Sequence, residues 1–365
     1  MRLDDLPTPC LVLDRGILKR NIATMADQLA RHGVPLRPHM KTAKSIDVAR
    51  LAIAGQAGGI TVSTLAEAEY FAGHGIRDIL YAVGITPRKL DQVAKLNGAG
   101  AAVIALTDDI DMAGTIARHR QPPRVLIEID TGEGRGGVTP DDPLLPRIAD
   151  RLGPYLVGVM THAGHSYAGR SIDDMIRIAE AERAGVARAA ERLRALGHSV
   201  SIVSMGSSPT ALHARHLDGV TEVRAGVYMF GDLFQAEIGT HDVDAIALTV
   251  LTSVIGRRPG LLVVDAGGLA LSKDRSTADA PRDYGFGLVL DVAGQRSHGD
   301  AIVRRAYQEH GVVEADPAHP LDLPIGAKLR IAPNHTCMTA AAHDRYFVVE
   351  GNDEVVAIWP RVNGW

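Results

Sequence analysis

The sequence lacks an excess of charge of one sign, long apolar runs and, almost entirely, cysteine. Lys and Arg number 39 and Asp and Glu 43, so the formal net charge is only −4, and no basic surface for nucleic acid or anionic lipid is expected. The apolar runs are too short to span a bilayer, and the N-terminal MRLDDLPTPC lacks the cationic and apolar regions of a signal peptide. We therefore expect a cytoplasmic protein that binds a small molecule, with no nucleic-acid or membrane partner.

The two cysteines, Cys10 and Cys337, stand far apart in a chain without an export signal. Free thiols are therefore expected rather than a disulfide. Cys10 lies in the apolar segment TPCLVLD and is interpreted as a small structural residue. Cys337 lies in the segment PNHTC, beside a histidine, and is a candidate for chemistry.

The chain has 365 residues, 46% of them hydrophobic, which suffices for one large barrel and a smaller domain. From about residue 36, short apolar segments alternate with amphipathic ones, as in repeated β–α units. Eight strands are predicted, at residues 36–41, 59–63, 78–83, 101–106, 124–130, 156–162, 201–206 and 222–230. Eight such units favour a TIM-type (β/α)8 barrel over an open doubly wound sheet.

The pattern changes after about residue 240, where strand-like segments follow one another with hardly any helix. The predicted organisation is α/β: residues 21–240 form the barrel and residues 241–365 form a C-terminal β-domain. Residues 1–20 are predicted to contribute an N-terminal strand to that β-domain.

Lys41 closes the first predicted strand of the barrel, in the segment LRPHMKTAKS. Active sites of TIM barrels lie at the C-terminal ends of the strands, so this lysine is a candidate nucleophile for a carbonyl. The alternative is a solvated lysine in a salt bridge at the barrel rim.

Small and hydroxyl-bearing residues follow the last two predicted strands, in MGSSPTA and RAGVYMF. TIM barrels commonly bind phosphate at these positions, here through backbone N–H groups and the side chains of Ser207, Ser208 and Thr210. A simple Gly/Ser turn is the alternative. A lysine opposite a phosphate site indicates pyridoxal 5'-phosphate, whose aldehyde forms a Schiff base with lysine.

Polar residues after the fifth and sixth predicted strands are further candidates. Arg135, in EIDTGEGRGGV, would keep the pyridine nitrogen of the cofactor unprotonated, or else is a loop arginine paired with Glu133. His162 and His165, in THAGHSY, could stack on the cofactor or transfer protons, or else are packed, hydrogen-bonded histidines. His162 is preferred because it is nearer the end of the strand.

The segment APNHTCMT carries a candidate metal site. In a strand, His335 and Cys337 would share one face and present an imidazole and a thiolate to zinc or a similar cation. Two ligands seldom complete a site, so water and substrate would fill the remaining positions, as in a catalytic site. Glu309 and His310, in YQEHG, either support these ligands or form a buried structural pair.

These residues resemble the fold-type III pyridoxal-phosphate enzymes, and among them the D-threonine aldolase and D-serine dehydratase family, whose relatives include alanine racemase. The resemblance covers nearly the whole chain and rests on TPCLVLD, LRPHMKTAKS, GSSPT with RAGVY, and PNHTC. It implies a barrel followed by a β-domain, and a homodimer with active sites near the interface.

The resemblance also implies roles for residues. Lys41 is the Schiff-base lysine, Arg135 the partner of the pyridine nitrogen and His162 the residue beside the ring, while His335 and Cys337 hold a divalent metal (Zn, Mn or Mg). Lys41 and His162 are the predicted catalytic residues. The other predicted cofactor-binding residues are Tyr167, Gly206, Ser207, Thr210, Gly226 and Tyr228.

The activity implied is that of a lyase on D-β-hydroxy amino acids. If Lys41 takes the α-proton, β-elimination follows and D-serine gives pyruvate and ammonia; if the β-hydroxyl loses its proton, aldol cleavage gives glycine and an aldehyde. Dehydratases of the family have His-x-Cys, as here, whereas some aldolase and hydroxyaspartate members have His-x-Asp. Dehydratases tend to read KTHK where this chain reads KTAK, with Ala43.

Because of Ala43, D-threonine aldolase is the preferred prediction and D-serine dehydratase the alternative. An amino-acid racemase ranks third, since it needs no metal and leaves NHTC unexplained. A non-catalytic pyridoxal-phosphate carrier is the remaining alternative, but the carriers of this type lack the β-domain.

Overall fold

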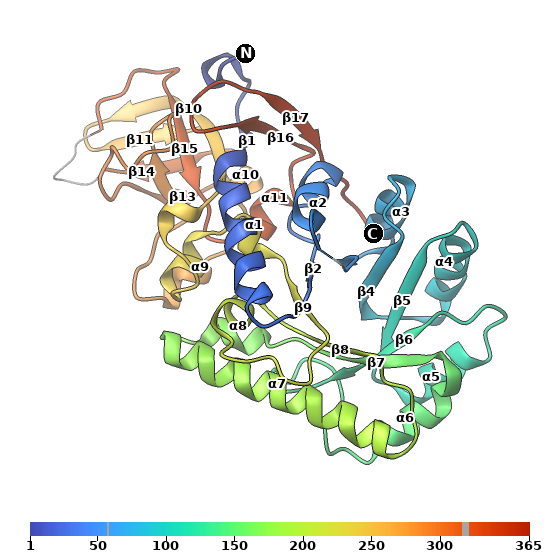
Figure 1. Ribbon diagram of the computed structural model, residues 1–365. Helices are drawn as coiled ribbons and strands as arrows, with labels where there is room; N and C mark the ends of the chain where they lie inside the picture. Colours follow the sequence, from blue (N-terminus) through green and yellow to red (C-terminus); the bar gives the residue numbers. More distant parts are fainter. Residues whose placement is uncertain (57, 316–320) are drawn as a thin grey trace. The chain divides into compact units, whose positions relative to one another are not determined.

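The computed structural model describes residues 1–56, 58–315 and 321–365. The chain divides into two compact units, one of Met1–Ala23 with Val227–Arg361 and one of Thr24–Gly226 with Val362–Trp365 (Figure 1). The sequence predicts boundaries after residues 20 and 240, whereas the chain divides after residues 23 and 226. The second boundary lies earlier than predicted because Leu233 packs in an apolar cluster with Tyr284 and Leu288 of the β-unit.

Eight parallel strands form the barrel of the second unit. They are β2 (Leu36–Pro38), β3 (Ile60–Val62), β4 (Asp78–Gly84), β5 (Ala102–Thr107), β6 (Val125–Ile129), β7 (Leu156–Thr161), β8 (Ile202–Met205) and β9 (Glu222–Ala225). They pair in the order β2-β9-β8-β7-β6-β5-β4-β3, and a parallel bridge between His39 and Thr61 joins the two ends. The TIM-type barrel predicted from the β–α alternation is therefore confirmed.

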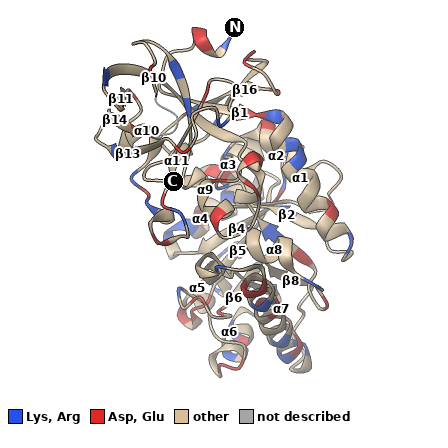
Figure 2. Ribbon diagram, turned by 90° about the vertical axis from the view of Figure 1, so that its left-hand side faces the viewer, with Lys and Arg blue, Asp and Glu red and all other residues tan. Residues whose placement is uncertain are grey.

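Helices alternate with these strands along the chain. They are α1 (Arg15–Ala30), α2 (Ile46–Ile53), α3 (Leu65–Gly73), α4 (Pro87–Gly98), α5 (Ile110–Ala117), α6 (Leu144–Leu152), α7 (Ile172–Ala195) and α8 (Ser208–His213). Side-chain caps begin several of them: Thr64 accepts from the Glu67 N–H at α3, and Asp109 from the Met112 N–H at α5. Figure 2 shows charges of both signs along α7. Within the described ranges, no helix combines the length and apolarity needed to cross a membrane.

The alternation of side chains along the strands decides what fills the barrel. The hydroxyl of Tyr81 accepts a hydrogen bond from Lys89 of α4 at 2.8 Å, so Tyr81 faces the helices and its neighbour Leu80 faces the interior. Leu80 packs in one buried cluster with four residues of the next three strands, namely Ile104, Leu106, Leu126 and Met160. Thr61 is paired with both Leu80 and His39, so His39 also faces the interior.

A buried ion pair lies in the same interior, two residues before His39. Arg37 donates through Nε to Glu222 at 2.8 Å and through its terminal nitrogens to Asp78 at 3.0 and 3.1 Å. The side chains of Arg37 and Glu222 are only 5% and 10% exposed. Because each charge is withdrawn from water, each depends on the other for its stability.

The first unit is built on a nine-stranded sheet with the order β11-β14-β13-β12-β15-β10-β1-β16-β17. Its strands are β1 (Cys10–Asp14), β10 (Leu248–Arg258), β11 (Leu261–Val264), β12 (Leu288–Leu290), β13 (Ile302–Ala306), β14 (Gly311–Glu314), β15 (Lys328–Ala332), β16 (Arg345–Val349) and β17 (Ala357–Pro360). Strand β1 pairs antiparallel with β10 and parallel with β16, which places the N-terminal strand inside this sheet. Three short helices, α9 (Leu233–Glu237), α10 (Gly268–Leu271) and α11 (Thr336–Ala340), complete the unit.

We expect Arg37→Met to lower the free energy of unfolding by about 3–5 kcal/mol, because it leaves the Glu222 carboxylate buried without its partner. Denaturant or thermal unfolding measures the change. The control is Arg188→Met, which removes an exposed arginine paired with Asp141 and should leave stability nearly unchanged. Arg37→Met combined with Glu222→Gln should recover part of the loss; equal stability of wild type and Arg37→Met would contradict the assignment.

Candidate active site

Lys41 lies three residues beyond β2, not inside it. The predicted strand 36–41 is too long because the chain turns after the single bridge at His39, and the Lys44 N–H donates to the Met40 carbonyl at 2.7 Å. The Lys41 N–H donates to Nδ1 of His39 at 3.3 Å. Burial lowers the pKa of His39 well below its ordinary value, and the charges of Lys41 and Arg224 lower it further. The positive charge of Lys41 therefore disfavours protonation of His39 in the barrel interior.

His162 follows β7 at the same end of the barrel. Its Nδ1 donates to the carbonyl oxygen of Gly206 at 2.9 Å. Because a carbonyl only accepts, Nδ1 carries the hydrogen and Nε2 is unprotonated in the neutral ring. Burial, and after it the charge of Lys41, lowers the pKa of His162 to about 3. The ring of Tyr167, in a 3-10 turn at Gly164–Ala168, lies 6.4 Å from that of His162.

Two glycines allow neighbouring backbones to meet at this end of the barrel. Gly206, after β8, has φ +133°, and a Cβ there would lie 2.3 Å from the carbonyl oxygen of Arg224. A Cβ on Gly226, after β9, would lie 2.8 Å from the carbonyl oxygen of His39. Only glycine fits either position. Two residues beyond Gly226, Tyr228 is buried in a 3-10 turn, and burial raises its pKa.

Glu182, on the buried face of α7, binds both loops that carry these residues. Its carboxylate accepts from the N–H of Ala163 at 3.0 Å, the N–H of Gly206 at 2.9 Å and the hydroxyl of Thr210 at 2.7 Å. Ser207 caps α8 and exchanges hydrogen bonds with Thr210. The N–H of Gly206 and the hydroxyl of Thr210, which lie in the segments predicted to bind a phosphate, thus both donate to Glu182.

The two arginines of this region differ in exposure. Arg135 has a 60% exposed side chain that pairs with Glu133 at 3.2 Å and approaches Glu128 at 3.9 Å, so the Glu133 pairing considered from the sequence is present. Arg224, on β9, is 3% exposed and donates to the carbonyl of Thr161. Its Nε has no hydrogen-bond partner among the described residues, which leaves one buried donor for a ligand.

The predicted strand at the metal motif is wrong. Strand β15 ends at Ala332, His335 is the N-cap of α11 with φ −140°, and Cys337 lies in the first turn of that helix. The helix begins here because the Thr336 N–H donates to the carboxylate of Asp232 at 3.0 Å and its hydroxyl to the Gly231 carbonyl. The side chains of His335 and Cys337 nevertheless hydrogen-bond to each other.

Asp274 is the close partner of His335. Its Oδ2 lies 2.8 Å from Nδ1 of the imidazole. Burial lowers the pKa of His335, but hydrogen bonds with Asp274 and Cys337 raise it to about 11 overall. The same hydrogen bond is the largest cause that lowers the pKa of Asp274 to about 2. In the parts of the chain that the structure describes, no group of three or more His, Cys, Asp or Glu side chains forms a complete metal site.

Glu309, His310 and the two cysteines are the remaining candidates. Glu309 and His310 are exposed in the turn between β13 and β14, so the buried pair considered from the sequence is not formed. Cys10 and Cys337 form no disulfide within the described residues, and burial raises the pKa of the Cys10 thiol to about 12.

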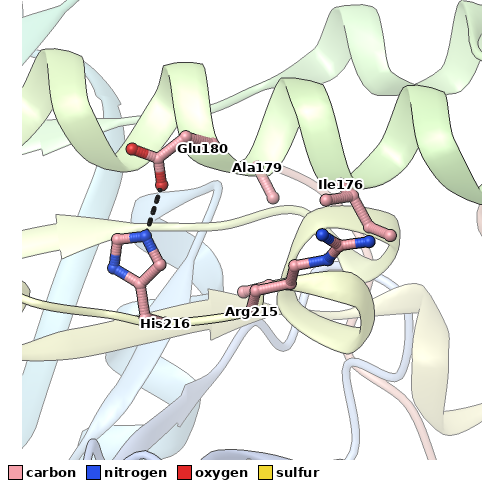
Figure 3. A pocket seen from close by; sticks show the side chains of 6 residues that line it. Ile176, Ala179, Glu180, Arg215 and His216 are labelled. Carbon is pink, nitrogen blue, oxygen red and sulfur yellow. Dashed lines mark ion pairs between the residues drawn. The ribbon is translucent and has the colours of Figure 1, made fainter.

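A small pocket lies between α7 and the segment after α8 (Figure 3). It is lined by Glu180, which pairs with His216 at 3.0 Å, and by Arg215. None of the predicted site residues lines it, so it does not belong to the candidate active site.

Known proteins resemble the chain over nearly its full length. It is 45% identical to D-threo-3-hydroxyaspartate dehydratase of Delftia sp. (strain HT23), over 99% of this chain and 98% of that protein. It is 30% identical to D-serine dehydratase of Dictyostelium discoideum over 97% and 96%, and 30% identical to D-threonine aldolase of Arthrobacter sp over 96% and 91%. Residues 13–233 match the model of the alanine racemase N-terminal domain, and residues 247–349 that of the putative serine dehydratase domain.

The chain belongs to the D-threonine aldolase and D-serine dehydratase family. Among solved structures, that of D-threo-3-hydroxyaspartate dehydratase from Delftia sp. HT23 superposes with a TM-score of 0.96 at 43% identity and covers 100% of both chains. A histidine-to-alanine variant of that enzyme, and a cysteine-to-alanine variant in the metal-free form, superpose equally well. The resemblance read from the sequence motifs is therefore confirmed.

Four residues that contact the predicted site residues were not predicted from the sequence: His39, Glu182, Arg224 and Asp274. Glu182 had a recognisable signal, because it is a carboxylate at helical spacing on the apolar face that includes Ile178 and Val186. His39 and Arg224 are polar residues within barrel strand segments, which also marks them as unusual. Nothing in the sequence around Asp274 indicates its contact with His335.

The depressed pKa of His162 predicts an acid sensitivity. The unfolded chain binds a proton at a pKa near 6.5 and the folded chain only near 3, so stability falls as the pH drops through that window. The His162→Asn variant should lose less stability between pH 6.5 and pH 3 than the wild type. Denaturant midpoints across this pH range measure the difference, and parallel curves for the two proteins would contradict a buried neutral His162.

Proposed function

We propose that this protein is a pyridoxal-phosphate- and divalent-metal-dependent lyase that eliminates water from D-β-hydroxy amino acids, with D-threo-3-hydroxyaspartate as the preferred substrate. One observation carries the choice of substrate: the end-to-end likeness, at 45% identity, to an enzyme with that name. The likeness to D-serine dehydratases is lower, at 30% for the Dictyostelium protein, so D-serine is the second substrate to consider.

The barrel residues fit the cofactor. Lys41 would bind its aldehyde covalently, His162 would lie beside the ring, and Arg135 would face the pyridine nitrogen. The unpartnered Arg224 Nε and the equally unpartnered hydroxyl of Thr61, both buried, support a polar ligand in this part of the barrel. The remaining predicted contacts come from Tyr167, Gly206, Ser207, Thr210, Gly226 and Tyr228. Among them, Gly206 and Thr210 would act through the shape of their loop, because Glu182 engages their polar groups.

The β-unit residues fit a divalent metal. His335 and Cys337 offer one imidazole and one thiol, the donors preferred by zinc and similar cations. In the solved D-threo-3-hydroxyaspartate dehydratase variants, the histidine and the cysteine that are replaced stand two positions apart, which is the spacing of His335 and Cys337. The metal-free state of the cysteine variant supports the same assignment here. Substrate and water would supply the other ligands.

When bound, the cofactor would supply an electron sink for the carbanion at Cα, and the metal would make the β-hydroxyl a better leaving group. Lys41 would take the α-proton. His162, whose pKa is about 3, is too weak a base to carry protons at neutral pH, so its role would be to pack and orient through its fixed Nδ1–H.

Aldol cleavage of D-threonine, the activity preferred from the sequence alone, is the second candidate function. It rests on Ala43, which stands where dehydratases tend to have histidine, and on 30% identity to the D-threonine aldolase of Arthrobacter sp. A homodimer, implied by the family resemblance, remains part of the proposal. Racemisation ranks below both because it gives His335 and Cys337 no role.

Product analysis distinguishes these activities. With D-threo-3-hydroxyaspartate, D-serine and D-threonine in parallel, we expect oxaloacetate and ammonia from the first at the highest kcat/KM, and a loss of activity after chelation that added divalent metal restores. Glycine with acetaldehyde from D-threonine as the dominant reaction would make the protein an aldolase. Full activity after chelation would exclude the metal role.

Lys41→Ala should abolish the visible absorption of the lysine-bound cofactor and lower kcat by roughly 10²–10⁴-fold or more. The matched control is Lys44→Arg, which keeps the charge paired with the buried Glu67 and should retain the absorption band. Absorbance spectra and single-turnover rates measure both effects. Loss of the band in the Lys44 variant, with retention in the Lys41 variant, would reassign the lysine.

A further inference from the structure

The contact between Asp274 and His335 sets which nitrogen of the imidazole would bind a metal. An ionised carboxylate only accepts hydrogen bonds, so the 2.8 Å contact with Oδ2 of Asp274 places the ring hydrogen on Nδ1. Nε2 is then the nitrogen left for a metal, which would bind there in place of a proton. Together with the hydrogen bond to Cys337, the contact also restricts rotation of the ring at the N-cap of α11.

Asp274 is itself held firmly. Its Oδ1 accepts from the Ser276 N–H at 2.7 Å, and its carbonyl oxygen accepts from the side-chain amide of Asn334 at 3.2 Å. Asn334 directly precedes His335, is 3% exposed, and donates a second hydrogen bond to the carbonyl of Gly285 at 2.7 Å. The loop that carries Asp274 is therefore tied to the residue next to the metal motif, so carboxylate and imidazole keep a fixed relation.

We propose that Asp274 is a positioning residue, which holds His335 in the tautomer and orientation in which Nε2 binds the divalent metal together with the sulfur of Cys337. The inference rests on the proposed function, because it requires His335 to be a metal ligand. Carboxylates that accept from a ligating histidine raise its basicity, and their loss typically weakens metal binding by about 10–100-fold.

A matched control separates this role from a general effect on the loop. Asp283 lies in the same loop region, accepts from the Gly285 N–H at 2.8 Å and pairs with Arg275 at 2.7 Å. Removing its charge alters the same segment without removing the hydrogen bond on Nδ1 of His335. Asp283→Asn is therefore the control for Asp274→Asn and Asp274→Ala.

The experiment measures the dissociation constant of Zn²⁺ and of Mn²⁺ in cofactor-loaded protein, by competition with a chromogenic chelator. We expect Asp274→Ala to bind about 10–100-fold more weakly than the wild type, and Asp283→Asn to bind equally well. Asp274→Asn should also bind weakly, since its amide can donate to Nδ1 and so place the ring hydrogen on Nε2. The visible cofactor spectrum and the melting temperature are measured for every variant, and unchanged values exclude a loss of fold.

A double-mutant test shows whether Asp274 acts through His335. Adding Asp274→Ala to His335→Ala should weaken metal binding no further than His335→Ala alone. Wild-type affinity of Asp274→Ala, or equal weakening by Asp283→Asn, would overturn the positioning role while leaving the proposed function intact, provided that His335→Ala loses metal. Retention of metal by His335→Ala would overturn both the positioning role and the metal part of the proposed function.

Discussion

The arrangement of the loops after β7 and β8 depends on the buried carboxylate of Glu182. Burial raises the pKa of Glu182, and hydrogen bonds from Thr210 and the N–H groups of Gly206 and Ala163 oppose this shift. These bonds hold the loops after β7 and β8 together. The carbonyl of Gly206 is thereby placed to accept from His162, so the tautomer of His162 follows from a carboxylate it does not touch. Removal of that carboxylate would leave buried donors unpaired.

The local pattern of apolar residues is enough to predict the barrel, because each strand and each helix has its own hydrophobic periodicity. It also predicts Lys41, His162 and Gly206 as site residues, because TIM barrels place their active sites after the ends of strands, and their roles stay predictions. The hydrogen bonds that hold His162 and Gly206 join positions 19 to 44 residues apart, and no local pattern encodes such contacts. Glu182 could have been predicted, because it is a carboxylate on an apolar helix face, whereas no such signal marks Asp274.

The side chains of His335 and Cys337 lie together as expected, although the strand predicted for their segment is not formed. The strand expected at PNHTC would place His335 and Cys337 on one face by alternation, yet β15 ends at Ala332. The two side chains meet because an extended N-cap residue is followed by the first turn of α11. The helix start depends on Asp232, which lies 104 positions from Thr336, and this dependence could not be read from the segment itself.

The choice between elimination and aldol cleavage depends on which proton leaves, and the electrostatics of the barrel bear on it. Aldol cleavage needs a base for the β-hydroxyl, but burial lowers the pKa of both His39 and His162, which makes them weak bases. Elimination needs a base for the α-proton, the role proposed for Lys41, and a Lewis acid for the departing hydroxide, the role proposed for the metal. Ala43, the reason to prefer an aldolase, is fully buried in the turn after β2. A histidine at this position would require the turn to repack, so the difference between KTAK and KTHK concerns the packing of the turn that carries Lys41.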